Sequence, residues 1–113
     1  MSIKEHPPQH VPVLLEACLE LLDPKDGERY LDLTAGYGGH AQAILECTTN
    51  YRQSCLVDRD EFAIQQLARF AEAGAELRHQ DFALASQELV AEGRQFDIIL
   101  VDLGVSSPQL DRA

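Results

Sequence analysis

The chain of 113 residues carries 19 acidic and 9 basic residues, a net charge of −10, and 45% of its residues are hydrophobic. This length suits one compact domain, and the acidic balance is unlike that of a basic nucleic-acid-binding module. The seven glycines and five prolines follow no period, which excludes collagen-like and low-complexity classes. No apolar run approaches the roughly 20 residues of a membrane span. Since no signal peptide is recognisable either, we expect a cytoplasmic protein with no membrane partner.

The expected elements alternate between helices and strands after a polar arm. Residues 1–10 are polar and proline-rich and predict an extended or unstructured arm. A first helix begins near Pro12, where a missing N–H costs nothing, and ends before Asp23 and Pro24. Further helices are predicted at residues 40–46, 62–71 and 82–90, and strands at residues 30–33, 54–57, 75–79 and 96–101. The helix at 62–71 is predicted from the apolar positions Phe62, Ala63, Leu67, Phe70 and Ala71.

Strands and helices that alternate at intervals of about 20 residues indicate βαβ units. The crossovers of such units are right-handed, and helices cover both faces of the sheet. The sequence therefore predicts an α/β fold of the Rossmann-like kind, with a parallel sheet of about four strands.

The cysteines and histidines suggest no metal or disulfide chemistry. Cys18, Cys47 and Cys55 form no CxxC pair, and we interpret them as small buried apolar side chains. His6 and His10 are four residues apart, but the two prolines between them disfavour a helix that would align them as ligands. We therefore predict no metal site.

Unusual residues follow every predicted strand. Ligands of open parallel sheets bind beyond the carboxyl ends of the strands. An acidic residue stands at each of these ends: Asp32, Asp58 with Asp60, Asp81, and Asp102. The glycine cluster at residues 36–39 follows the first strand, where glycine lets the backbone turn tightly and approach a ligand closely. The helix that comes next offers free N–H groups at its N-terminus.

The spacing within this pattern indicates an adenosine-containing cofactor. Asp58 lies 20 residues after Gly38, the distance at which dinucleotide-binding folds place the acid that holds ribose hydroxyls. Ala41 satisfies the last position of the G-x-G-x-x-G/A pattern, so NAD remains open. Asp32 and Asp102 would suit the ammonium group of S-adenosylmethionine and would repel a pyrophosphate. The charge pattern therefore favours S-adenosylmethionine.

Four sequence strings occur in the order and at the spacing of one family. They are HVPVLL at residues 10–15, LDLTAGYGGH at 31–40, DRD at 58–60 and DLGVSSPQLD at 102–111. With them the chain resembles the N-terminal part of the MraW/RsmH methyltransferases. The last string is highly specific, the glycine string moderately so, and DRD alone is weak. The resemblance implies a class I methyltransferase fold that uses S-adenosylmethionine to methylate the exocyclic amine of a cytidine in 16S ribosomal RNA.

The resemblance also implies roles for single residues. Gly38, Gly39 and His40 would contact the methionine end of the cofactor. Asp58 would hold the ribose hydroxyls, in agreement with its spacing, and Phe82 would lie against the adenine.

The end of the fourth strand would close the cofactor pocket. The resemblance places Asp102 and Gln109 there. Asp102 matches the first position of the Asp/Asn-Pro-Pro-aromatic motif of many amino-methyltransferases, but the prolines and the aromatic residue are absent, and no catalytic base is assigned. Ser106 and Ser107 have no His–Asp partner pattern and are interpreted as loop residues. The cofactor-binding residues predicted are Gly36, Gly38, Gly39, His40, Asp58, Phe82, Asp102 and Gln109.

Members of the resembled family are far longer than this chain. They continue with an inserted helical domain and the last strands of the sheet, so residues 11–113 would form the cofactor-binding half, with 16S rRNA of the small ribosomal subunit bound through the full-length protein. The strand at 96–101 would then have an unpaired edge here, and we expect self-association across it or marginal stability. Two alternatives stay open: a non-catalytic module that binds S-adenosylmethionine or a protein partner, and a fragment of an NAD-linked dehydrogenase.

Overall fold

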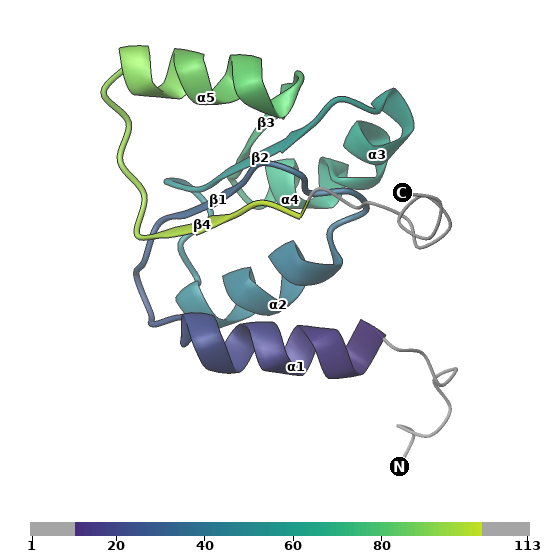
Figure 1. Ribbon diagram of the computed structural model, residues 1–113, viewed down its shortest axis with the longest axis vertical. Helices are drawn as coiled ribbons and strands as arrows, with labels where there is room; N and C mark the ends of the chain where they lie inside the picture. Colours follow the sequence, from purple (N-terminus) through teal and green to yellow (C-terminus); the bar gives the residue numbers. More distant parts are fainter. Residues whose placement is uncertain (1–10, 103–113) are drawn as a thin grey trace, which may run out of the picture.

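The computed structural model describes residues 11–102, in which strands and helices alternate along the chain. Four strands form one sheet in the order β3-β2-β1-β4, and every neighbouring pair is parallel (Figure 1). The strands are β1 (Tyr30–Asp32), β2 (Cys55–Asp58), β3 (Glu76–His79) and β4 (Ile98–Leu100). In the shared register, Leu31 lies opposite Cys55 on one side and Ile99 on the other. The predicted α/β fold with a parallel sheet is confirmed, and its strand order is that of the first half of a Rossmann-like sheet.

Helices cover both faces of this sheet. They are α1 (Val11–Leu22), α2 (Gly39–Thr48), α3 (Glu61–Gln66), α4 (Ala68–Glu72) and α5 (Phe82–Ala91). Figure 1 shows α1 and α2 stacked on one side of the sheet and α5 on the other. Leu67 and Phe70, from the α3–α4 region, pack on the same face of the sheet as α2. Both belong to the core cluster that contains Ala41 and Ile44 of α2.

The alternation of side chains along the strands produces two cores. Tyr30, Leu56 and Ile98 point to the face covered by α2 and belong to the larger cluster. Leu31 and Val57 point to the other face and pack against Ala85 and Leu89 of α5. Because both faces of β1 and β2 are buried, these two strands are apolar up to the aspartate that ends each of them, as expected for central parallel strands.

The helix predicted at residues 62–71 is in fact two short helices. The backbone N–H of Leu67 is shared between the carbonyls of Ala63 and Ile64, at 3.0 and 3.1 Å, and this tightened turn separates α3 from α4. The tightening turns Leu67 and Phe70 into the core, where both are buried. Phe62 and Ala71, which the single helix also contained, are exposed instead.

Ion pairs tie together the amino ends of the strands. Arg29, just before β1, donates from its guanidinium and from its backbone N–H to Asp97, just before β4, at 2.8–3.1 Å. Arg78 on β3 pairs with Glu76 and Glu92, and Arg94 pairs with Glu76 at 2.8 Å. The first contact joins the starts of β1 and β4, and the other contacts join β3 to the chain at the end of α5.

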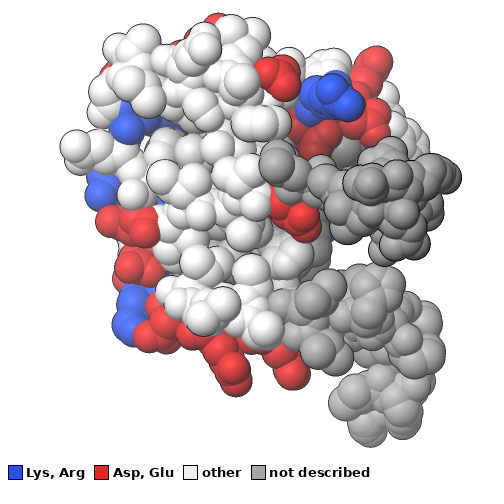
Figure 2. All heavy atoms as spheres, viewed as in Figure 1, with Lys and Arg blue, Asp and Glu red and all other residues white. Residues whose placement is uncertain are grey.

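Among the described strands, β4 lies at one edge and pairs with β1 alone. The side chains of Ile99 and Val101 are 54% and 43% exposed. Figure 2 shows the molecule from the same side as Figure 1. The middle of this face is largely uncharged, and most charged side chains lie toward its margins. This edge is the place of the predicted self-association, which stays a prediction.

Three other expectations concern the cysteines, membrane-spanning helices and the N-terminal arm. Of the cysteines, Cys55 is buried as predicted, Cys18 is half-buried and Cys47 is exposed. No helix within residues 11–102 is long and apolar enough to cross a membrane. The arm predicted at residues 1–10 lies outside the described residues, so the domain division at residue 10 stays a prediction.

Candidate functional site

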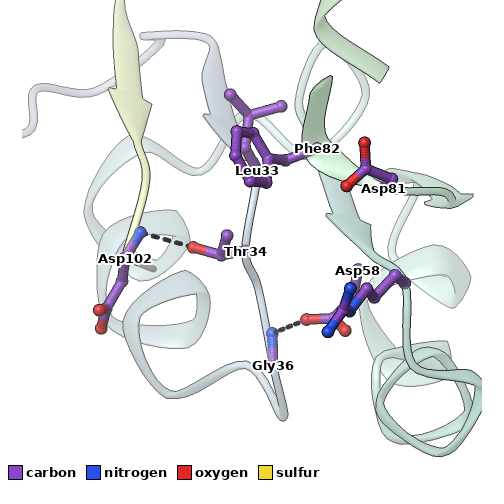
Figure 3. Close-up of a pocket in the computed structure, with 8 residues that line it drawn as sticks. Leu33, Thr34, Gly36, Asp58, Asp81, Phe82 and Asp102 are labelled. Atoms are coloured by element: carbon purple, nitrogen blue, oxygen red, sulfur yellow. Dashed lines mark hydrogen bonds between the residues drawn. The ribbon is translucent and has the colours of Figure 1, made fainter. Parts of the chain in front are cut away.

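A cavity of about 400 Å³ opens at the carboxyl ends of the strands (Figure 3). Its walls come from the loops that follow β1, β2 and β3 and from the residue two positions after β4. The lining residues are Leu33, Thr34, Gly36, Asp58, Arg59, Asp81, Phe82 and Asp102. A volume of this size lies within the range of roughly 300–1,000 Å³ that small-molecule sites occupy.

The glycine loop after β1 is shaped by two left-handed residues. Gly36 has φ +58° and Gly38 has φ +93°. A Cβ at Gly38 would come within 2.6 Å of the Phe70 ring, so the loop packs directly against α4. A Cβ at Gly36 would meet nothing within 4 Å. Since Gly36 lines the cavity, its bare backbone leaves room for a ligand on that side.

Asp58 at the end of β2 holds this loop against its own strand. One carboxylate oxygen accepts the N–H of Gly36 at 2.7 Å, and the other accepts the N–H of Asp60 at 2.9 Å. The backbone N–H of Ala35 also donates to the carbonyl of Val57. Each carboxylate oxygen has a second lone pair, so Asp58 can still accept hydrogen bonds from hydroxyl groups in the cavity.

The end of β3 contributes a capping acid and an aromatic ring. Asp81 is the N-cap of α5 and accepts the N–H groups of Ala83 and Leu84 at 3.1 and 3.3 Å. Phe82 follows it, with its side chain 39% exposed on the cavity wall. Phe82 therefore presents an apolar surface to the cavity instead of packing in the core.

The β1 loop is also tied to the end of β4. The hydroxyl oxygen of Thr34 accepts the N–H of Asp102 at 2.6 Å, as Figure 3 shows. The N–H of Leu33 donates to the carbonyl of Leu100 at 3.0 Å. Together these bonds fix where Asp102 enters the cavity wall.

Asp32 occupies a different position from the other acids at the strand ends. It is 1% exposed and does not line the cavity. The Tyr30 hydroxyl donates to its Oδ2 at 2.6 Å and the Thr34 N–H donates to its Oδ1 at 3.1 Å. Burial raises its pKa to about 6, although both hydrogen bonds act in the opposite direction. The expectation that Asp32 directly meets an ammonium group is therefore wrong, because the side chain has no surface to offer.

Comparison with known proteins shows which family this chain belongs to. Residues 8–113 match the model of the MraW methylase family. The chain belongs to the MraW methylase family.

Individual relatives carry a common name. The chain is 45% identical to Ribosomal RNA small subunit methyltransferase H of Desulfovibrio desulfuricans, over 100% of the chain and 36% of that protein. It is 42% identical to the protein of the same name from Rickettsia massiliae, over 92% of the chain and 34% of that protein. The chain thus spans about a third of the length of these curated relatives. Among solved structures, the chain is similar to the crystal structure of PH0851, with 26% sequence identity and a TM-score of 0.63. The match covers 78% of this chain and 20% of the PH0851 chain.

Half of the predicted site residues come together in this member of the family. Gly36, Asp58, Phe82 and Asp102 line one cavity. Gly38, Gly39 and His40 form the end of the glycine loop and the start of α2, next to Gly36 in the chain, and do not line the cavity. Gln109 lies outside the described residues.

Four lining residues were not among the predicted site residues: Leu33, Thr34, Arg59 and Asp81. Asp81 stands at a predicted strand end directly before Phe82, and this position is a signal for a site residue. Thr34 belongs to the family-like string LDLTAGYGGH, but nothing in the spacing distinguishes its hydroxyl from any other. No group of three or more His, Cys, Asp or Glu side chains suited to a metal occurs in the described part of the chain.

Proposed function

We propose that this chain is the cofactor-binding part of a methyltransferase that uses S-adenosylmethionine to methylate the exocyclic amine of a cytidine in 16S ribosomal RNA. One observation carries the proposal: in a chain of the MraW methylase family, Gly36, Asp58, Phe82 and Asp102 line a single cavity at the carboxyl ends of parallel strands. Ligands of such sheets bind at this edge. The RNA target is proposed for the whole protein, from the name of its relatives.

The cavity suits the proposed cofactor in size and in chemistry. An adenosine has a flat apolar base and a ribose with two hydroxyl donors. The exposed ring of Phe82 supplies a surface for the base, and Asp58 supplies acceptors for the hydroxyls. The open side of Gly36 leaves space between them.

The remaining contacts are proposed from the family pattern. Gly38, Gly39 and His40 would hold the methionine end, where the start of α2 offers backbone N–H groups to a carboxylate. Asp102 and Gln109 would close the cavity from the side of β4. Among the residues lining the cavity, acids predominate over the single basic residue Arg59, which favours a ligand that carries a positive charge.

Little further chemistry is required of the protein. The cofactor, when bound, supplies a methyl group that its sulfonium already activates. The chain must orient it, and the hydrogen bonds by which Asp58 and Thr34 hold the loop after β1 would serve that purpose. The target amine loses a proton at or after transfer, so an acceptor near Asp102 would help, but no residue is assigned as the base.

Isothermal titration of this chain with S-adenosylhomocysteine tests the proposal. We expect saturable binding, and Asp58→Ala should weaken it roughly tenfold or more, because hydrogen bonds to a charged acceptor contribute about 1.5–3 kcal/mol each. Glu61→Ala is the matched control, since Glu61 is an exposed acid at the same edge of the sheet that does not line the cavity. NAD is the control ligand.

The outcomes separate the open alternatives. Tighter binding of NAD than of S-adenosylhomocysteine would revive the dehydrogenase reading. Failure of a folded chain to bind S-adenosylhomocysteine would contradict the assigned cofactor site. If the full-length protein binds the cofactor but transfers no methyl group to small-subunit rRNA, the non-catalytic module becomes the better description.

A further inference from the structure

A buried pair of side chains lies behind the cofactor cavity, and no proposed contact uses it. Tyr30 and Asp32 stand two residues apart on β1, so both point to the same face of the sheet. Their side chains are 0% and 1% exposed, and the hydroxyl of Tyr30 lies 2.6 Å from the carboxylate. Within residues 11–102 no arginine or lysine forms an ion pair with Asp32, and a buried carboxylate without such a partner is costly.

Asp32 connects to the cavity through Thr34. Its Oδ1 accepts the Thr34 N–H at 3.1 Å, and this bond sets the turn by which the chain leaves β1. The hydroxyl of Thr34 in turn accepts the N–H of Asp102 at 2.6 Å. Three hydrogen bonds therefore run from Tyr30 in the core to Asp102 on the cavity wall, and Thr34 and Asp102 both line the cavity.

We propose that Asp32 is a positioning residue for cofactor binding: its carboxylate, held by the Tyr30 hydroxyl, fixes the turn at Thr34, and Thr34 fixes Asp102 at the cavity. This inference rests on the proposed function and deepens it. Asp32 acts through Thr34 and does not touch the ligand.

The charge of Asp32 makes this role depend on pH. Burial raises its pKa to about 6, and the Tyr30 hydroxyl counteracts that rise. Burial also raises the pKa of Tyr30, so this hydroxyl stays a donor at every practical pH. Within the described residues, the other titratable groups that interact with Asp32 are Cys18 of α1, His40 of α2 and Asp58 of β2. Asp102 after β4 is linked to Asp32 through Thr34. An ionised acceptor holds the Thr34 N–H more strongly than a neutral one, so affinity should fall as the pH drops through about 6.

Titration with S-adenosylhomocysteine from pH 5 to pH 8.5 tests the role. Tyr30→Phe removes only the hydroxyl, and we expect about tenfold weaker binding at pH 7, with the midpoint of the pH profile moved upward. Tyr51→Phe is the matched control, because Tyr51 packs against the same core cluster, and it should change neither property. Asp32→Asn should abolish the pH step. The pH step should persist in a His40→Gln background, whatever that substitution does to the affinity itself, because the step belongs to Asp32.

A second measurement needs no ligand. The N–H of Asp102 should be protected from hydrogen exchange in the wild type. We expect Thr34→Val to remove this protection, Tyr30→Phe to reduce it, and Thr34→Ser, which keeps the hydroxyl, to preserve it.

The two measurements fail separately. If the folded wild type does not bind S-adenosylhomocysteine but exchange follows the expected order, the cofactor assignment fails and the positioning network stands. If the wild type binds and Tyr30→Phe matches it in affinity, pH profile and exchange, the positioning role is overturned.

Discussion

The two ends of the parallel strands use their acids in opposite ways. At the amino ends, carboxylates pair with arginines, as Asp97 does with Arg29 and Glu76 with Arg94. At the carboxyl ends, the acids accept backbone N–H groups: Asp58 holds Gly36, and Asp81 holds the start of α5.

The acids at the amino ends therefore hold the sheet together, whereas the acids at the carboxyl ends shape the loops around the cavity. An arginine neutralises the acid that it binds, whereas a backbone N–H orders a loop and leaves the negative charge in place. The carboxyl edge therefore keeps both its loop geometry and its attraction for a positively charged or hydroxyl-rich ligand. An acidic composition alone, with a net charge of −10, does not reveal this division.

The largest expected effect contrasts two glycines on either side of β1. Gly27 and Gly38 have nearly equal φ angles, +91° and +93°. A Cβ at Gly38 meets Phe70 at 2.6 Å, whereas one at Gly27 meets nothing within 4 Å. We expect Gly38→Ala to lower the free energy of unfolding by about 3 kcal/mol and Gly27→Ala by about 1 kcal/mol, measured by urea denaturation. Equal losses would mean that the glycine loop is not packed against α4 as described.

A pair of asparagine substitutions should have opposite pH dependences. Burial raises the pKa of Asp32 from 3.8 to about 6, so the folded state favours its protonated form. Relative to Asp32→Asn, the wild type should therefore be most stable below the unfolded pKa of 3.8 and lose about 3 kcal/mol as the pH rises through about 6 to 7.5. Hydrogen bonds from Arg29 lower the pKa of Asp97 to about 2. The contribution of Asp97 to the free energy of unfolding should therefore be complete above pH 4 and be lost as the pH falls through about 2.

Urea denaturation across this pH range distinguishes the two acids. The pH-dependent difference in stability should be smaller for Asp97→Asn than for Asp32→Asn. The Arg29–Asp97 ion pair is about one-third exposed, at 35% for each side chain, and water screens it. A stability difference for Asp32→Asn that stays flat from pH 4 to pH 7.5 would show that Asp32 is not buried as a titrating carboxylate.

The smallest effect concerns the exposed edge of β4. Ile99 and Val101 present apolar surface there, and no strand of residues 11–102 pairs with the outer edge of β4, which invites pairing with a second copy. We expect weak self-association that Ile99→Lys suppresses, whereas Val90→Lys on the far side of α5 should leave it unchanged. Size-exclusion chromatography with light scattering measures this, and a stable monomer at high concentration would count against it.

Much of the fold follows from local patterns in the sequence. The apolar runs at β1 and β2 and the glycine cluster predict central strands and a tight loop, because burial on both faces leaves little choice of side chain. The break at Leu67 was not predictable, since it depends on how Leu67 and Phe70 fill the space beside Gly38. The strand predicted at residues 96–101 is only Ile98–Leu100, because Asp97 is bound to Arg29 at its start.

The site was predicted less completely, since acids of one kind have different surroundings. Asp58 and Asp102 line the cavity as expected, but Asp60 caps α3 and Asp32 is buried. Sequence spacing locates a residue at a strand end and does not determine whether its side chain turns outward. One signal was available: Tyr30 and Asp32 share a strand face, so a hydroxyl next to a carboxylate could be inferred from the period of two.

The pairing of β1 with β4 has a consequence for how the chain folds. Tyr30 lies opposite Ile98, so 68 residues separate the two strands along the chain, whereas Leu31 and Cys55 are much closer. Closing the longer loop costs more entropy, and contacts of this range slow folding. During synthesis, β1, β2 and β3 can pair before residues 98–100 leave the ribosome. We therefore expect the bond from Asp102 to Thr34 to form after β1, β2 and β3 have paired, so that the cavity wall is completed late in folding.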